Sequence, residues 1–149
     1  MKLELEIKQK SFKNEYAKCL VNLIFTSAWL EKKSKDFFIQ YDLTPQQYNT
    51  LRILRGQHPV PSSINLIKER MLDKMSDASR IVQRLEVKKL LIKKIPSHNK
   101  RLMEVYINQA GLNILEEIDD KIIELEESLH RLNKNEIKTL NELLDKLRN

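Results

Sequence analysis

The chain has 149 residues and a formal net charge of +6, and 41% of its residues are hydrophobic. This length and composition allow one ordered domain or a compact two-part domain, and the excess of Lys and Arg favours an anionic partner. Two glycines exclude a glycine-rich phosphate loop, and a single cysteine, Cys19, excludes an internal disulfide and fits a reducing compartment.

Residues 11–38 are predicted to form a long helix with more apolar surface than one contact can bury. Its apolar side chains recur every three or four residues, and further large ones broaden the stripe. Such a helix must bury more than one side, and a partner subunit is one way to do so. Because Cys19 lies on this stripe among apolar neighbours, we expect a small buried side chain there in preference to a redox switch.

Nothing in the sequence predicts export or insertion into a membrane. The first residues alternate in charge and lack the apolar core of a signal peptide. No apolar run approaches the roughly 18 residues that a transmembrane helix needs. We therefore expect a cytoplasmic protein.

A second helix is predicted to start sharply near residue 44. Thr44 is a suitable N-cap, Pro45 fits the first helical position, and Gln47 completes a capping box. Gly56 is expected to end this helix.

Two further helices have helix-turn-helix spacing. Ser62 or Ser63 caps the first, a turn of about four residues follows, and the second runs from about Ser76 to Lys89. The second helix buries an apolar stripe and presents polar groups opposite it, and Arg and Gln can bond the edges of guanine and adenine. The alternative is an ordinary solvated face. The candidate DNA-binding residues of this helix are Ser76, Asp77, Ser79, Arg80, Gln83, Arg84 and Lys88.

A basic β-hairpin is predicted to follow this helix. Residues 92–95 and 103–107 are the strands, and residues 96–101 form the loop between them. Arg101 at the tip suits the negative potential of a narrow minor groove, and the alternative is an ordinary basic turn. The candidate DNA-binding residues of the hairpin are Lys93, Lys94, His98, Asn99, Lys100 and Arg101.

The C-terminal third is predicted to be one long helix over residues 109–132 and a last helix that starts at Asn133 or Asn135. Leucines and isoleucines in the long helix recur with the alternating three- and four-residue steps of a coiled coil. We therefore expect a dimer built from both terminal regions of the chain. The candidate interface residues are Phe12, Tyr16, Ile118, Ile122, Leu125, Leu129, Leu140 and Leu144.

With these elements in this order, the sequence resembles the MarR family of bacterial transcriptional regulators. The resemblance depends on residues 43–54 (LTPQQYNTLRIL), on the helix 76–91, and on a hairpin that ends in Asn99-Lys100-Arg101 and leads to Asn108-Gln109-Ala110-Gly111. It implies a mainly α chain with a small β wing. Residues 42–108 would be a winged helix-turn-helix lobe, with dimerisation helices in 1–38 and 109–149.

The resemblance also implies a function. Each subunit of a homodimer would place the helix 76–89 in the major groove of a palindromic operator and the wing in the adjacent minor groove. Family members are commonly repressors released by small phenolic or lipophilic ligands, or by thiol oxidation. Because family pockets for such effectors lie between the dimer helices and the DNA-binding lobe, a pocket here would use aromatic residues near that junction, for which plain core packing is the alternative. The candidates are Trp29, Phe37, Phe38, Tyr41 and Tyr48.

The sequence departs from the family pattern at two positions. Asn99 replaces the usual Asp of the wing, which weakens the link that orients Arg101. Lys89 stands where the family usually has the glycine that ends the recognition helix. If the backbone of Lys89 is left-handed, the side chain costs about 1 kcal/mol relative to glycine.

Two other classes of protein are weighed against a DNA-binding regulator. One is a helical, dimeric protein-interaction module with a winged-helix domain that does not read DNA specifically. The other is an enzyme, which we do not expect because no H-E-x-x-H motif and no nucleophile–base grouping is recognisable. His58, His98 and His130 lack metal-ligand spacing, so neither a metal nor a cofactor is expected.

Overall fold

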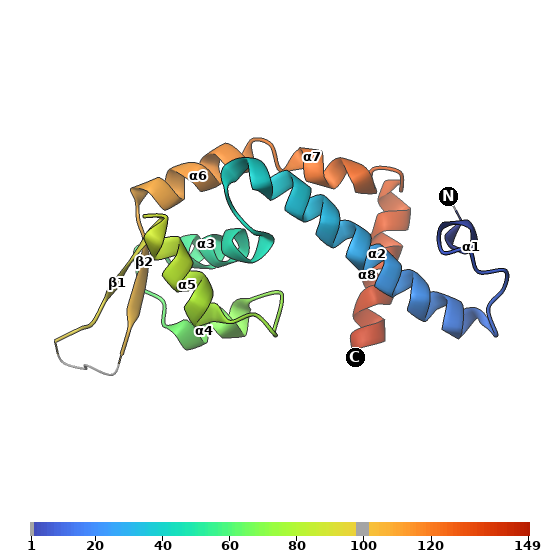
Figure 1. Ribbon diagram of the computed structural model, residues 1–149, viewed down its shortest axis with the longest axis horizontal. Coiled ribbons are helices and arrows are strands. Elements are labelled where there is room, and N and C mark those ends of the chain that lie inside the picture. Colours follow the sequence, from blue (N-terminus) through green and yellow to red (C-terminus); the bar gives the residue numbers. More distant parts are fainter. Residues whose placement is uncertain (1, 98–101) are drawn as a thin grey trace.

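The protein consists of a compact lobe and a helical arm (Figure 1). The computed structural model describes residues 2–97 and 102–149. The lobe lies at one end, the arm reaches to the other, and both chain termini lie in the arm. The lobe holds α3 (Pro45–Gln57), α4 (Ile64–Arg70), α5 (Ala78–Val87), β1 (Leu91–Lys94), β2 (Glu104–Ile107) and α6 (Gln109–Asp119). The arm holds α1 (Leu3–Glu6), α2 (Glu15–Phe38), α7 (Ile123–Glu126), η2 (Glu127–Leu129) and α8 (Lys134–Arg148), and η1 (Ile39–Tyr41) links α2 to the lobe.

The helix starts of the lobe are fixed by side-chain caps, as the sequence predicts. At α3 the Thr44 hydroxyl accepts from the Gln47 N–H at 3.1 Å, and the Gln47 side chain accepts from the Thr44 N–H at 3.0 Å. This confirms the capping box. The side chain of Ser63 caps α4 by accepting from the Leu66 N–H, and the side chain of Asn108 caps α6 by accepting from the Gly111 N–H.

The end of α3 differs from the prediction. The helix continues through Gly56 to Gln57, so Gly56 does not end it. His58 instead leaves the helical region, with ψ 135°. The physical reason is Pro59, because a proline disfavours helical backbone at the residue before it.

The core of the lobe is formed by apolar side chains from α3, α4, α5, both strands and α6. Ile118 of α6 is fully buried there. The prediction that Ile118 belongs to a dimer interface is therefore wrong. Other fully buried apolar residues include Leu51, Ile67, Leu85, Val105 and Leu115.

The two strands pair antiparallel, with Leu91 opposite Ile107 and Lys94 opposite Glu104. Ser62 adds a short bridge to β2, since its N–H and C=O each bond Val105 at 2.9 Å. The hairpin is therefore anchored to the segment before α4. The strands begin or end within one residue of the predicted positions.

The helix α5 ends at a left-handed residue. Lys89 has φ 60°, and the Leu90 N–H reaches back to the Leu85 carbonyl at 3.1 Å. Together with the bond from the Lys89 N–H to Glu86, this is a Schellman motif, in which glycine is usual at the left-handed position. The backbone of Lys89 is therefore left-handed, which was the condition for its side chain to be unfavourable relative to glycine.

The prediction of one helix over residues 109–132 is wrong. The chain turns after Asp119, forms the short α7 and η2, and turns again before α8. The last turn of α6 carries no basic residue, and acidic side chains there oppose the helix dipole. The turn directs Leu115 and Ile118 into the lobe and brings α7 alongside α2 (Figure 1). Across the described ranges, no helix combines the length and apolar character needed to cross a membrane.

Candidate nucleic-acid interface

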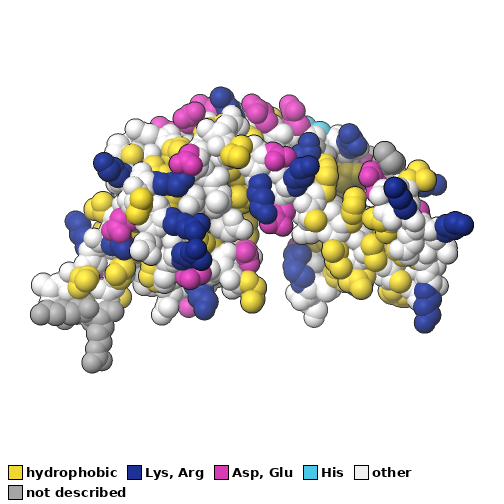
Figure 2. Space-filling model, viewed as in Figure 1, with side chains coloured by type: hydrophobic (Ala, Val, Ile, Leu, Met, Phe, Trp, Pro, Cys, Tyr) yellow, Lys and Arg dark blue, Asp and Glu magenta, His cyan; other side chains and the backbone are white. Residues whose placement is uncertain are grey.

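The helix α5 separates a buried face from an exposed polar face. Ala78, Val82 and Leu85 pack into the core. The opposite face carries exposed side chains with hydrogen-bonding or charged ends, and Lys and Arg gather over this side of the lobe (Figure 2). Those exposed residues of α5 are Ser79, Arg80, Gln83 and Arg84.

Arg80 and Arg84 are the free cations of this face. Neither guanidinium has an ion-pair partner among residues 2–97 and 102–149. Both line an open groove of about 640 Å³ between α5 and the start of α3, where Thr44 and Gln47 form the far wall. Their donors therefore face solvent and are available to an anionic partner.

Two predicted contact residues instead shape the start of α5. The helix begins at Ala78 and not at Ser76, and Asp77 is its N-cap, accepting from the Arg80 N–H at 3.0 Å. The Ser76 hydroxyl donates to the Asp73 carboxylate at 2.8 Å. Because these side chains are already engaged, their first role is to hold the helix start in place.

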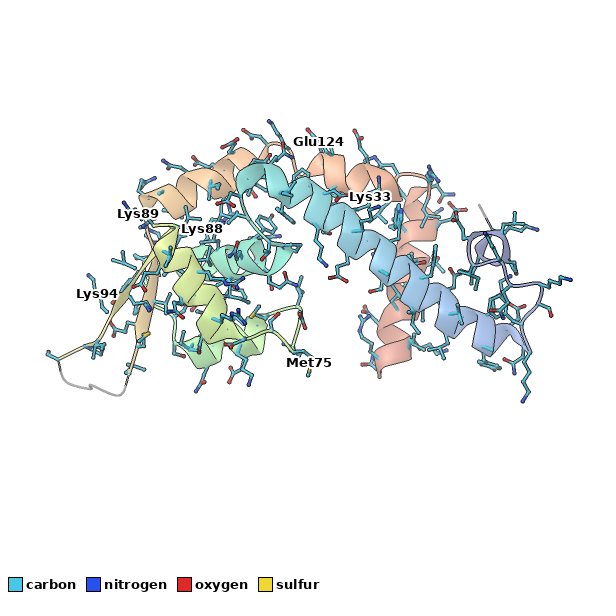
Figure 3. All side chains as sticks on the ribbon, in the orientation of Figure 1. Lys33, Met75, Lys88, Lys89, Lys94 and Glu124 are labelled. Atoms are coloured by element: carbon cyan, nitrogen blue, oxygen red, sulfur yellow. The ribbon has the colours of Figure 1, made fainter. Side chains whose placement is uncertain are left out.

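Two of the predicted lysines form ion pairs within the described part of the chain. The Lys88 ammonium lies 2.7 Å from the Asp42 carboxylate and also donates to the Asp42 carbonyl. Lys93 pairs with Glu86 at 2.6 Å. Figure 3 labels Lys88 and Lys94 on adjoining parts of the lobe.

Lys94 lies against an aromatic ring of the wing. Its ammonium is 5.2 Å from the centre of the Tyr106 ring, and the Tyr106 hydroxyl donates to the Glu104 carboxylate at 2.8 Å. This hydrogen bond raises the pKa of the Tyr106 hydroxyl. The wing-tip candidates His98, Asn99, Lys100 and Arg101 lie outside the described residues, and β1 and β2 lead up to them.

The aromatic residues predicted for an effector pocket are divided between two places. Phe38, Tyr41 and Tyr48 are buried in the core, where the Phe38 and Tyr48 rings stack with centres 4.4 Å apart. For these three, packing in the core accounts for the position. Trp29 and Phe37 instead line a hollow of about 530 Å³ between α2 and α7.

This hollow carries charges of both signs. Lys33 of α2 and Glu124 of α7 lie on its opposite sides (Figure 3), and Arg131 is a further lining residue. The Lys33 ammonium is 6.0 Å from the centre of the Trp29 ring. The sequence periodicity did not reveal these charged residues, because their juxtaposition depends on the turn between α6 and α7.

The arm exposes much of its apolar surface. Tyr16 is 88% exposed, Leu129 and Leu140 are also exposed, and the remaining candidate interface residues Phe12, Ile122, Leu125 and Leu144 are partly buried. Cys19 is exposed as well, so the expectation of a buried cysteine is wrong for the single chain. The reason is that α2 is covered by its own subunit along only part of its circumference.

These features define a winged helix-turn-helix protein with a helical arm. No family model matches the sequence, and no curated protein matches it. Solved structures do match: a MarR transcription factor from Planctomyces limnophilus has 27% identity and a TM-score of 0.70, over 91% of this chain and 98% of that one. The chain has the fold of the MarR family of transcriptional regulators.

Two further structures of this fold were solved to study DNA binding. A mutant of E. coli MarR complexed with operator DNA has a TM-score of 0.77 at 20% identity, over 93% of this chain and 99% of that one. Bordetella bronchiseptica BpsR is described as having its DNA binding regulated by 6-hydroxynicotinic acid. It has a TM-score of 0.68 at 22% identity, over 87% of this chain and 99% of that one. At these identities the likeness shows the fold.

Proposed function

We propose that this protein is a sequence-specific, DNA-binding transcriptional regulator. The observation that carries the proposal is the exposed face of α5, where two arginines without an ion-pair partner among the described residues lie beside Ser79 and Gln83. A helix of this kind fits the major groove, where Arg pairs with guanine and Gln with adenine. E. coli MarR, which shares the fold, has been solved with operator DNA.

The wing adds contacts outside the major groove. β1 and β2 project beside α5, and they lead to the basic residues Lys100 and Arg101 (Figure 1). An arginine at such a tip suits the minor groove, where the potential is most negative when the groove is narrow. The two elements together would fix the orientation of the lobe on the duplex.

We further propose that the protein acts as a homodimer. The arm exposes Leu20 and Ile24 of α2 and Leu143 of α8, at 61%, 64% and 59%. Such a concentration of apolar surface marks an interface more often than a solvated face. Two recognition helices about 34 Å apart would enter successive major grooves, which requires a palindromic operator.

A small-molecule effector would act through the hollow between α2 and α7. The hollow lies in the arm, next to the helix α2 that leads through η1 into the lobe, and Trp29 and Phe37 give it aromatic walls. A ligand releases DNA only if it binds the DNA-incompetent arrangement more tightly. BpsR, with DNA binding regulated by 6-hydroxynicotinic acid, is a precedent for ligand-regulated DNA binding in this fold. In this chain such a ligand would release a repressor from its operator.

Selection from random duplex DNA tests the proposal. The purified chain should enrich a palindromic sequence, and its affinity for the enriched duplex should fall steeply between about 50 and about 200 mM salt, because bound phosphates release counterions. Enrichment of nothing, with weak salt dependence, would instead favour the protein-interaction module. Light scattering of the same sample should give twice the 17.7 kDa chain mass.

A further inference from the structure

Two large apolar side chains stand out on the polar side of the lobe. Met75 is 93% exposed and Leu72 is 86% exposed, and both lie in the turn that joins α4 to α5. Figure 3 shows Met75 at the lower edge of the lobe, on the side toward the arm. Single exposed apolar residues need no explanation, but two in one turn beside a DNA-reading helix are a local feature to be accounted for.

The turn holds Met75 in a defined position. The Met75 N–H donates to Asp73 Oδ1 at 3.0 Å, and the Ser76 hydroxyl donates to Asp73 Oδ2 at 2.8 Å. The Leu72 N–H donates to the Asn49 side chain of α3 at 3.0 Å. Both ends of the turn are therefore tied down, and the apolar side chains project from a fixed backbone.

The acidic groups next to Met75 are already occupied. Asp73 accepts the two bonds of the turn, which lower its pKa, and Asp77 caps α5. Lys74 lies between them in the sequence, and its ammonium donates to the Glu69 carbonyl at 2.5 Å. An anionic duplex that approaches the start of α5 therefore meets two carboxylates that already accept hydrogen bonds. It also meets the ammonium of Lys74 beside the apolar side chains.

We propose that Met75 contacts the C5-methyl group of a thymine in the major groove, with Leu72 flanking it. In helix-turn-helix proteins, the first residues of the recognition helix contact the base edges, and Met75 lies three residues before the first residue of α5. The thymine methyl is the apolar group on those edges. Methionine is long, flexible and polarisable, so it suits contact with a small methyl group.

This inference rests on the proposed function and adds a determinant of sequence preference to it. The residues Arg80, Gln83 and Arg84 read donors and acceptors, whereas Met75 would read an apolar group. Each half-site would then contain a thymine that the full chain prefers over deoxyuridine, which has the same pairing edge and lacks the methyl.

The test is a thymine-to-deoxyuridine scan of the enriched duplex, one position at a time, with the full-length chain. At one position in each half-site, loss of the methyl should weaken binding about four-fold, the equivalent of about one buried methyl-sized group. In Met75→Ala the same replacement should change nothing. Val60→Ala, at an apolar residue that is 62% exposed in the connector before α4, should keep the full four-fold difference.

Three results would overturn the inference. One is a scan in which no thymine matters to the parent chain, and another is a Met75→Ala chain that keeps the parent's preference. The third is a lower mass of Met75→Ala in light scattering, since Met75 would then contact the partner subunit. In all three the parent still binds the enriched duplex, whereas failure of the proposed function would leave no enriched duplex at all.

Discussion

The ammonium of Lys88 lies 2.7 Å from the carboxylate of Asp42, so the end of α5 is linked to the junction between η1 and α3. Lys88 also donates to the Asp42 carbonyl. Its charge is thus partly compensated before any DNA arrives. This pair connects the helix that would read DNA with the segment that leads out of the arm helix α2.

The first prediction concerns the charge of Lys88. Asp42→Asn should free Lys88 for a phosphate and increase the salt slope of DNA binding by about one unit. Asparagine tolerates the left-handed backbone at this position, where φ is 51°, and an exposed ion pair contributes only about 0–1 kcal/mol, so the melting temperature should barely change. Lys88→Ala should leave the slope close to that of the parent. A slope that falls in Lys88→Ala and does not rise in Asp42→Asn would show that Lys88 already binds phosphate.

A second prediction compares the two glycines. A Cβ at Gly111 would lie 2.2 Å from the Leu90 carbonyl oxygen, so α6 packs against the end of the Schellman motif too closely for any side chain. Gly111→Ala should lower the free energy of unfolding by about 1–3 kcal/mol, as overpacking does. The measurement is urea unfolding at one protein concentration.

Gly56 provides the matched control. It lies inside α3, and nothing comes within 4 Å of a Cβ placed there. Gly56→Ala should therefore raise the free energy of unfolding by about 0.5–1 kcal/mol through helix propensity. If Gly111→Ala and Gly56→Ala lowered the free energy of unfolding equally, the close approach of α6 to Leu90 would be contradicted.

A third prediction tests the left-handed end of α5. Lys89→Gly should stabilise the protein by about 1 kcal/mol, because glycine has no Cβ to strain at φ 60°. Lys89→Ala removes the same charge but keeps a Cβ, so it should give no comparable gain. Thermal unfolding of the two variants separates the backbone effect from the charge effect.

A fourth prediction concerns the arm. Leu20→Asp should halve the mass measured by light scattering and abolish DNA binding, because it places a charge in the proposed interface. Val60→Asp, at a residue with nearly the same exposure but in the lobe, should leave the mass unchanged. A Leu20→Asp chain that keeps the parent's mass would remove α2 from the interface. Leu125 is less suitable for this test, since it packs against the core of its own subunit.

A fifth prediction concerns the wing tip. Arg101→Ala should weaken binding to the enriched duplex by about 1–3 kcal/mol, the range of a single specific contact, with the free energy of unfolding unchanged. Affinity and urea unfolding are measured on the same preparation. Binding as tight as that of the parent would show that the wing does not use this arginine.

The sequence predicted the features that depend on near neighbours. The capping box at Thr44 and the cap at Ser63 are each decided within a few residues, and the two strands follow one another in the sequence. A left-handed backbone at Lys89 was considered because the resemblance places a glycine of the family at this position, and the structure has φ 60° there. The exposed face of α5 followed from its helical periodicity.

The features that depend on distant residues were not predictable in this way. The partner of Lys88 is 46 residues away, and no local pattern pairs the two. The coiled-coil spacing of residues 115–132 was real, but the turn after Asp119 sends Ile118 into the core of the lobe. Periodicity shows which side chains need burial, and only the fold decides what buries them.

The most direct test of DNA reading by α5 is the affinity of Arg80→Ala/Arg84→Ala for the duplex that the parent enriches. Arg148→Ala is the control for loss of a positive charge, because Arg148 is exposed at the end of α8 and pairs with Asp145. The double variant should lose at least ten-fold in affinity, about 1.4 kcal/mol, and also its preference for the enriched sequence. The control should bind like the parent. A double variant that still prefers the enriched sequence as strongly as the parent would contradict the assignment of α5 as the recognition helix.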